Sequence, residues 1–83
     1  MQDLKVLQRR TVGLKQTVKA IKNGTAVKVY LAEDADDFIK QSVIDVCRDK
    51  NLQIIYVNNM KELGDACGID IGASTAAITK QDA

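Results

Sequence analysis

The chain is 83 residues long, 46% apolar and 28% charged, with a formal net charge of +1. This length fits one small domain, residues 1–83, and the composition excludes a disordered chain. No apolar run approaches the ~18 residues of a membrane span, and the N-terminus lacks the apolar segment of a signal peptide. We therefore expect a cytoplasmic protein with no membrane attachment.

Two cysteines and the absence of histidine limit the chemistry of this chain. Cys47 and Cys67 lie twenty positions apart with no CxxC pair, so the ligands of a structural zinc site are missing. We interpret both thiols as buried core residues. The lack of histidine also removes the commonest general base near neutral pH. We expect no catalytic residue, no metal and no cofactor.

The spacing of apolar residues predicts helices that alternate with strands. In chain order we expect a helix over residues 3–10, a turn or two-residue strand at 11–13, a helix over 14–22, a strand over 26–32, a helix that ends near 50–51, a strand over 52–57, a helix over 60–67 and a strand over 73–79. This order predicts a three-layer α/β/α sandwich around a small mixed four-stranded sheet.

Two of the predicted strands differ in their apolar pattern. In the strand over 26–32, Val27, Val29 and Leu31 fall on one face, while Lys28 and Tyr30 fall on the other. The strand over 52–57 is an almost unbroken apolar run, which is typical of a strand buried on both faces.

An acidic stretch over residues 33–37 precedes the helix that ends near residue 50. Clustered carboxylates could form a metal or acid–base site. The alternative is a helix cap, because Asp is a favoured N-cap and negative charge complements the helix dipole. We favour the cap. Gly64, Gly68 and Gly72 recur every four residues, and we interpret them as helix and loop punctuation.

Charge is divided unevenly along the chain. Residues 1–28 contain seven basic side chains and one acidic side chain, whereas residues 29–83 contain five basic and ten acidic ones. The net charges of these segments are therefore +6 and −5. This asymmetry indicates a polyanionic partner for the N-terminal third, and a solvated charged face is the alternative.

The helix over 14–22 combines an apolar stripe with a basic one, about 100° apart on ideal helical geometry. Its lysines are Lys15, Lys19 and Lys22. Its N-terminus, which follows Gly13, adds free N–H groups and a partial positive charge that suit phosphate. The three aromatic residues, Tyr30, Phe38 and Tyr56, lie in core-like patterns, which argues against recognition by base stacking. We expect the helix to enter an RNA groove that is bent or locally opened.

Three segments of the chain resemble the L7Ae/L30e ribosomal-protein superfamily, specifically its short bacterial branch of kink-turn RNA-binding proteins. They are VGLKQTVKAIKNG at 12–24, VYLAEDAD at 29–36 and LGDACGIDIGA at 63–73. The resemblance implies an α/β/α sandwich that binds a kink-turn. In that RNA element a bulge bends two stems sharply beside tandem sheared G·A pairs.

The resemblance also implies a set of RNA-binding residues. Lys15, Gln16 and Lys19 fall on family positions that read the G·A guanines, and Gly13 would let the backbone approach closely. The loop of Ile69, Asp70 and Ile71 falls where the family covers unstacked bases. We expect Arg10 and Lys22 to be secondary phosphate contacts. In archaeal and eukaryotic members, Asn and Glu mostly stand at positions 15 and 16, and many of these members have proline at position 72.

We therefore expect a non-catalytic, monomeric protein that recognises and stabilises kink-turns in ribosomal or regulatory RNA. One alternative is a protein–protein adaptor that keeps the fold with little RNA affinity. Another is an accessory RNA-binding domain for an RNA-modifying enzyme. The presence of Lys15, Gln16 and Lys19 together favours the first hypothesis over the adaptor.

Overall fold

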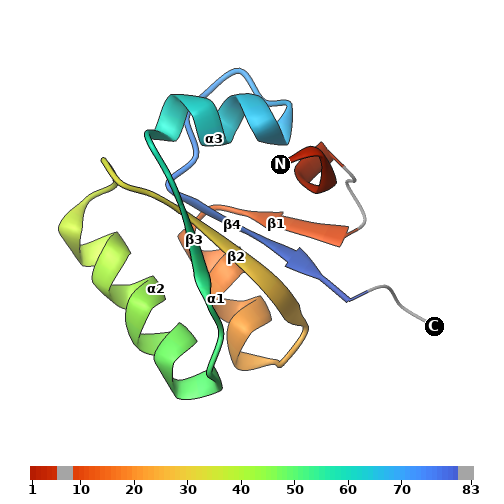
Figure 1. Ribbon diagram of the computed structural model, residues 1–83, viewed down its shortest axis with the longest axis vertical. Helices are drawn as coiled ribbons and strands as arrows, with labels where there is room; N and C mark the ends of the chain where they lie inside the picture. The colour runs from red at the N-terminus through yellow and green to blue at the C-terminus, as the bar shows by residue number, and fades with distance from the viewer. Residues whose placement is uncertain (6–8, 81–83) are drawn as a thin grey trace.

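A computed structural model describes residues 1–5 and 9–80 of the chain (Figure 1). Its elements are the 3₁₀ helix η1 (Gln2–Lys5), β1 (Arg10–Val12), α1 (Leu14–Lys22), β2 (Ala26–Ala32), α2 (Asp37–Lys50), β3 (Ile54–Val57), α3 (Met60–Cys67) and β4 (Thr75–Thr79). Within these residues the strands form one sheet of four in the order β1-β4-β2-β3. β2 pairs with β3 in parallel, and β4 pairs antiparallel with both β1 and β2.

The sheet separates two apolar clusters, which confirms the predicted three-layer α/β/α sandwich. On one face, α1 and α2 cover a cluster that includes Ile21, Val29, Leu31, Val43 and Cys47. On the opposite face, α3 and η1 cover a cluster that includes Leu4, Tyr30, Ala32, Leu63 and Cys67 (Figure 1). Both cysteines are buried and free, as predicted. Burial raises the pKa of the Cys47 thiol to about 11.

The helix caps agree with the predicted boundaries. Asp36 Oδ1 accepts a 2.8 Å hydrogen bond from the Phe38 amide, so the acidic stretch caps α2 as expected. Asp34 Oδ1 accepts from the Met60 amide at 2.8 Å and so ties the same stretch to the start of α3. α3 ends at Gly68, which has a φ of +76°. In the described part of the chain, no cluster of three or more Cys, Asp or Glu is arranged to hold a metal ion.

The prediction that the strand at 52–57 is buried on both faces is wrong. β3 covers only Ile54–Val57, and Ile55 and Tyr56 are 41% and 52% exposed. Among residues 1–5 and 9–80, β3 lies at the edge of the sheet and pairs only with β2, so its other side has no neighbouring strand there. Val27 also departs from its predicted face: it is exposed because the β2–β4 register shifts between Ala26 and Lys28.

The N-terminal prediction is also corrected. In place of a helix over 3–10, the chain forms η1 and then β1, which pairs Arg10, Thr11 and Val12 with β4. Pairing with β4 overrides the weak helical pattern of this segment. Residues 6–8 of the expected helix lie outside the described residues. β4 begins at Thr75, two residues later than expected.

The three spaced glycines serve different purposes. Gly68 is punctuation, because it ends α3 in the left-handed conformation. A Cβ on Gly64 would collide with the carbonyl oxygen of Ile71, and one on Gly72 would lie 3.1 Å from Met60 Cβ. Gly64 and Gly72 therefore allow the loop after α3 to pack closely against that helix, which corrects their interpretation as punctuation.

Candidate nucleic-acid interface

Gly13 turns the chain from β1 into α1. Its φ of +95° lies in the region that favours glycine. Its amide donates to the Thr75 carbonyl at 2.8 Å, and its own carbonyl accepts from the Thr17 amide at 3.1 Å. Apart from Gly13 and its two neighbours in the chain, no heavy atom of the described residues lies within 4 Å of the position where a Cβ would be. Gly13 is therefore required for its backbone angle, and the space in front of it is open.

The residues at the N-terminus of α1 provide no side-chain acceptor for the first backbone amides of the helix. Gly13 has no side chain that could cap the helix, and the first turn contains no acidic residue. The first amides of an α-helix have no partner within the helix and carry its partial positive charge. This end of α1 therefore presents free N–H donors at the protein surface.

A buried threonine fixes the rotation of α1 about its axis. Thr17 is fully buried, and its Oγ1 lies 2.8 Å from Thr11 Oγ1 on β1. With this side of the helix held against the sheet, Lys15, Gln16 and Lys19 are left exposed. The side chains expected to read bases are therefore accessible, and their helix cannot turn them inward.

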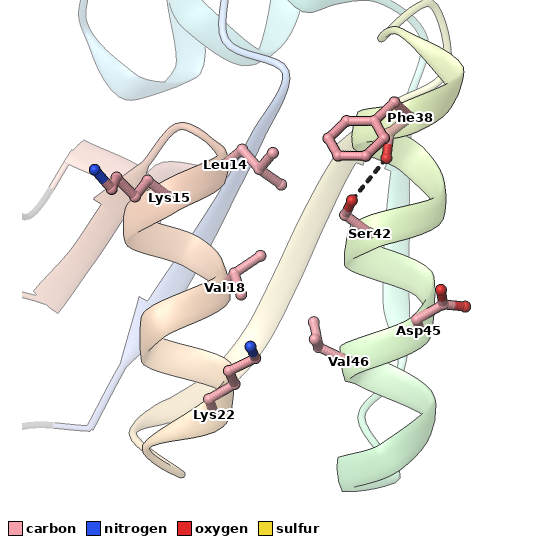
Figure 2. A pocket seen from close by; sticks show the side chains of 8 residues that line it. All are labelled: Leu14, Lys15, Val18, Lys22, Phe38, Ser42, Asp45 and Val46. Carbon is pink, nitrogen blue, oxygen red and sulfur yellow. Dashed lines mark hydrogen bonds between the residues drawn. The ribbon is translucent and has the colours of Figure 1, made fainter.

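Two hollows flank α1 and divide the expected site residues. Gln16 and Lys19 border a hollow of about 300 Å³ on the side of β1 and β4. Lys15 and Lys22 border a groove of about 580 Å³ between α1 and α2 (Figure 2). The structure brings Gln16 and Lys19 together on one side of α1. Lys22 turns its ammonium toward the groove on the other side, whereas Lys15 borders that groove with its ammonium pointing away from α2 (Figure 2).

Arg10, which is expected to be a secondary phosphate contact, makes hydrogen bonds within the fold. Its Nη1 donates to the Leu4 carbonyl at 2.7 Å and also to the Cys67 carbonyl. The alternation of β1 explains this placement, since Arg10 and Val12 face the α3 side of the sheet while Thr11 faces α1. Arg10 therefore connects η1 to the end of α3, and we assign it a structural role.

The loop after α3 runs back along that helix. The Ile69 amide donates to the Gly64 carbonyl at 3.1 Å, and the Ala73 amide donates to the Met60 carbonyl at 3.0 Å. Ile69 is partly buried against the core, whereas Asp70 is exposed and Ile71 is 75% exposed. The bond from the Gly13 amide to the Thr75 carbonyl joins the start of β4, just beyond this loop, to the start of α1. The loop after α3 and the start of α1 therefore lie at the same end of the sheet, where β1 ends and β4 begins (Figure 1).

The basic residues of the N-terminal third are not equally available. Lys28 Nζ lies 3.0 Å from Asp3 Oδ2, and the Tyr30 hydroxyl donates to Asp3 Oδ1 at 3.3 Å. Partial burial alone would raise the pKa of Asp3, but Lys28 and the Tyr30 hydroxyl hold it below its ordinary value of 3.8. Among the described residues, the salt bridges leave Lys15, Lys19 and Lys22 unpaired. Among these residues, α1 therefore carries three unpaired basic side chains, and Lys5 and Arg9, nearer the N-terminus, are exposed and unpaired as well.

Phe38 lies at the surface, although its sequence pattern predicts a place in the core. Its side chain is 73% exposed and borders the groove between α1 and α2 (Figure 2). The helical spacing contained a signal, because the apolar face of α2 begins at Ile39 and continues through Val43. Phe38, one position earlier, lies about 100° from that face. Tyr56, on β3, also proved exposed, whereas Tyr30 is buried as expected.

No helix in the described ranges, 1–5 and 9–80, has both the length and the apolar character needed to cross a bilayer.

Comparison with known proteins gives relatives along most of the chain. This chain is 46% identical to a Caldanaerobacter subterraneus protein that is named an RNA-binding protein. The alignment spans 69 residues and covers 83% of this chain and 84% of the relative. The chain is 45% identical over 78 residues to a Geobacillus sp. (strain WCH70) protein of the same description, with 92% and 95% covered. Among solved structures, the 15.5kD RNA binding protein of Giardia lamblia superposes with a TM-score of 0.82. That pair is 28% identical and covers 98% of this chain and 68% of the other.

A family model matches residues 2–83, nearly the full length of the chain. Together with the identities above, this match confirms the resemblance seen in the three sequence segments. The chain belongs to the ribosomal protein L7Ae/L30e/S12e/Gadd45 family.

Proposed function

We propose that this protein binds RNA, and that its specific target is the kink-turn. The observation that carries the proposal is the uncapped N-terminus of α1, which presents free amides beside the unpaired Lys15 and Lys19. Amides at a helix N-terminus and nearby ammonium groups are complementary to phosphate and to the acceptor edges of bases. The names of the bacterial relatives as RNA-binding proteins support the same function.

The exposed side chains of α1 suit base recognition in a widened groove. Lys15 and Lys19 can donate to guanine O6 and N7, and the amide of Gln16 offers both a donor and an acceptor. The open space in front of Gly13 would admit the RNA backbone. The major groove of regular A-form RNA is too deep and narrow for such contacts, so the proposal requires RNA that is bent and opened. A kink-turn meets this requirement at its G·A pairs.

The loop at Ile69–Ile71 supplies a second contact. Ile71 exposes an aliphatic side chain next to the exposed Asp70, at the sheet edge from which α1 begins. An unstacked base near the bulge would cover Ile71 and remove its apolar surface from water. Ile69 packs partly against the core, so we assign it to the support of the loop.

Binding of this kind acts by shifting a population and requires no catalysis. A protein that binds the kinked RNA more tightly than the extended RNA draws the equilibrium toward the bend. We propose this role, in ribosomal or regulatory RNA of the cytoplasm, for the protein as a monomer. Lys22 would contribute a phosphate contact at the far end of α1.

Calorimetric titration of two RNAs tests the proposal. One is a kink-turn, and the other is the same RNA with its G·A pairs replaced by Watson–Crick pairs. We expect tight binding to the first and weak binding to the second. Equal binding to both RNAs, or binding to neither, would sink the proposal.

The variant Lys19→Ala sharpens this titration. If Lys19 reads a base, its loss weakens kink-turn binding by about 1–3 kcal/mol. Lys50→Ala is the matched control, because it removes an exposed lysine from the last turn of α2, away from the start of α1. A loss for Lys19→Ala that is uniform across unrelated RNAs would mean that Lys19 contacts only phosphate.

A further inference from the structure

The groove between α1 and α2 extends beyond the proposed kink-turn contacts. It is lined by Leu14, Lys15, Val18, Lys22, Phe38, Ser42, Asp45 and Val46. Figure 2 shows the ring of Phe38 at the same level as Leu14, across the groove, at the end where both helices begin. The floor is therefore aliphatic, and one end has an exposed aromatic ring.

Hydrogen bonds fix the backbone of Phe38 while leaving its ring unpacked. Its amide donates to Asp36 Oδ1 at 2.8 Å, and its carbonyl accepts from Ser42 Oγ at 2.8 Å. The side chain nevertheless remains 73% exposed. An aromatic ring on a fixed backbone offers a flat apolar face to a ligand at little further cost in backbone entropy.

The charged side chains around the groove favour an anionic occupant. Figure 2 shows the ammonium of Lys22 turned toward the groove, whereas the carboxylate of Asp45 points away from it. Gln41 Nε2 donates to Asp45 Oδ1 at 2.8 Å, and Arg48 Nη1 lies 3.9 Å from the same oxygen. Leu14 and Lys15 of the first turn of α1 line the groove, so the groove is continuous with the proposed RNA interface, although the Lys15 ammonium itself points away from α2.

We propose that this groove receives one unpaired nucleotide of the RNA that α1 binds. The inference rests on the proposed function and extends it. The base packs against the ring of Phe38 and the aliphatic side chains of Leu14 and Val18. Base–aromatic stacking of this kind is a general mode of single-strand recognition.

The polarity of the groove sets the direction of the nucleotide. Asp36 and Asp37 lie beside Phe38 at the start of α2, and Lys22 lies in the last turn of α1. The ring of Phe38 holds the uncharged base at the first end, and the ammonium of Lys22, which faces the groove, attracts phosphate at the second. The uncharged base therefore lies toward Phe38, and the phosphate lies toward Lys22.

The test compares a blunt-ended kink-turn with the same kink-turn carrying unpaired adenosines beside either stem. Wild-type protein should bind one of the extended RNAs at least about fivefold more tightly than the blunt RNA, the lower end of what one base–aromatic stack contributes. Phe38→Ala should remove this gain and leave the affinity for the blunt RNA unchanged. Tyr56→Ala, which removes an exposed aromatic residue from β3, is the matched control and should keep the gain.

A fluorescent base and a salt titration check the two halves of the nucleotide. 2-Aminopurine in place of the unpaired adenosine should be quenched by the wild type but not by Phe38→Ala. Lys22→Ala should lower the salt dependence of binding by about 0.7, in the slope of log affinity against log salt, for the extended RNA. A circular dichroism melt confirms that each variant is folded.

The outcomes separate this inference from the proposed function. Equal affinity of the wild type for blunt and extended RNAs, or an extension gain that survives in Phe38→Ala, overturns the nucleotide site. Kink-turn binding would then stand, and the groove would be left for a partner of another class, such as a peptide helix. If the wild type binds no kink-turn at all, both the proposed function and the nucleotide site are wrong.

Discussion

The N-terminus of α1 contrasts with the N-termini of α2 and α3. All three helices follow a strand, and the three strands β1, β2 and β3 end at the same end of the sheet. Asp36 caps α2, and Asn59 caps α3 by accepting from the Glu62 amide at 2.8 Å. α1 begins at Gly13 with no cap and with Lys15 in its first turn. Among the α-helices that the structure describes, the N-termini of α2 and α3 are thus capped by side chains, and that of α1 has no side-chain cap from the described residues.

The comparison shows how an open helix end is tolerated. A side-chain cap contributes about 0.5–2 kcal/mol of stability, which α1 lacks. Packing holds α1 in place instead, through the buried Thr17, Ala20 and Ile21 and the Thr11–Thr17 hydrogen bond. Tertiary contacts in the middle of the helix therefore leave its first turn free for binding.

The largest expected effect comes from making α1 resemble the other two helices. Lys15→Glu places an acidic side chain in the first turn, which should raise the stability of the protein by about 0.5 kcal/mol through the helix dipole. The same change puts a negative charge where the RNA is proposed to bind, so kink-turn affinity should fall by more than about tenfold. Thermal unfolding and calorimetric titration measure the two effects. Lys15→Gln, which only removes the charge, should give a smaller change in both.

If Lys15→Glu bound the kink-turn as tightly as wild type, the proposed difference in function between the N-terminus of α1 and those of α2 and α3 would be wrong. It would mean that the open end of α1 has no electrostatic role in RNA binding.

The reciprocal change removes a cap from a helix that is already satisfied. Asn59→Ala should lower the free energy of unfolding by about 1 kcal/mol, because the Glu62 amide loses its acceptor. Kink-turn affinity should stay within about twofold of wild type, since the cap belongs to the fold. Urea unfolding and RNA titration, performed on the same preparation, check both expectations. A large loss of affinity with unchanged stability would contradict the division of roles.

The smallest effect concerns Lys28, whose charge is used within the fold, unlike the charges of α1. The pKa of Asp3 is held below 3.8 by Lys28 and the Tyr30 hydroxyl, against the opposing effect of burial. The stabilisation from this lowered pKa is complete above the unfolded value and is lost as the pH falls through the folded value. Unfolding melts between pH 5 and about 2 should show this loss in wild type. Asp3→Asn should lack this component and bind RNA normally at neutral pH.

The sequence was most informative where local signals and packing agree. The predicted bounds of α1 and β2 match the structure, because α1 ends at Asn23-Gly24 and β2 is a run of β-branched and apolar residues. The exposed lysines of α1 were also predictable, since a helix with one apolar stripe must turn its other side outward. The roles proposed for these lysines depend on the family resemblance and remain predictions.

Long-range pairing decided the features that the sequence did not reveal. Nothing local shows that the apolar run of β3 lies at a sheet edge, because the strand order depends on the whole chain. Pairing of β1 with β4 placed the Arg10 guanidinium where it donates to the Leu4 and Cys67 carbonyls. The exposure of Phe38 could have been predicted from its position about 100° away from the apolar face of α2. Its aromatic side chain favoured a core assignment instead.

The proposed interface depends on Gly64, although this residue is buried and cannot contact RNA. It is buried under the loop, and any side chain at this position would push against the Ile71 carbonyl. The absence of a side chain at Gly64 thus sets how closely the loop packs on α3, and with it the position of Ile71 at the surface. A random mutagenesis screen for lost RNA binding should therefore recover changes at position 64, and surface mapping alone would misassign them as contacts.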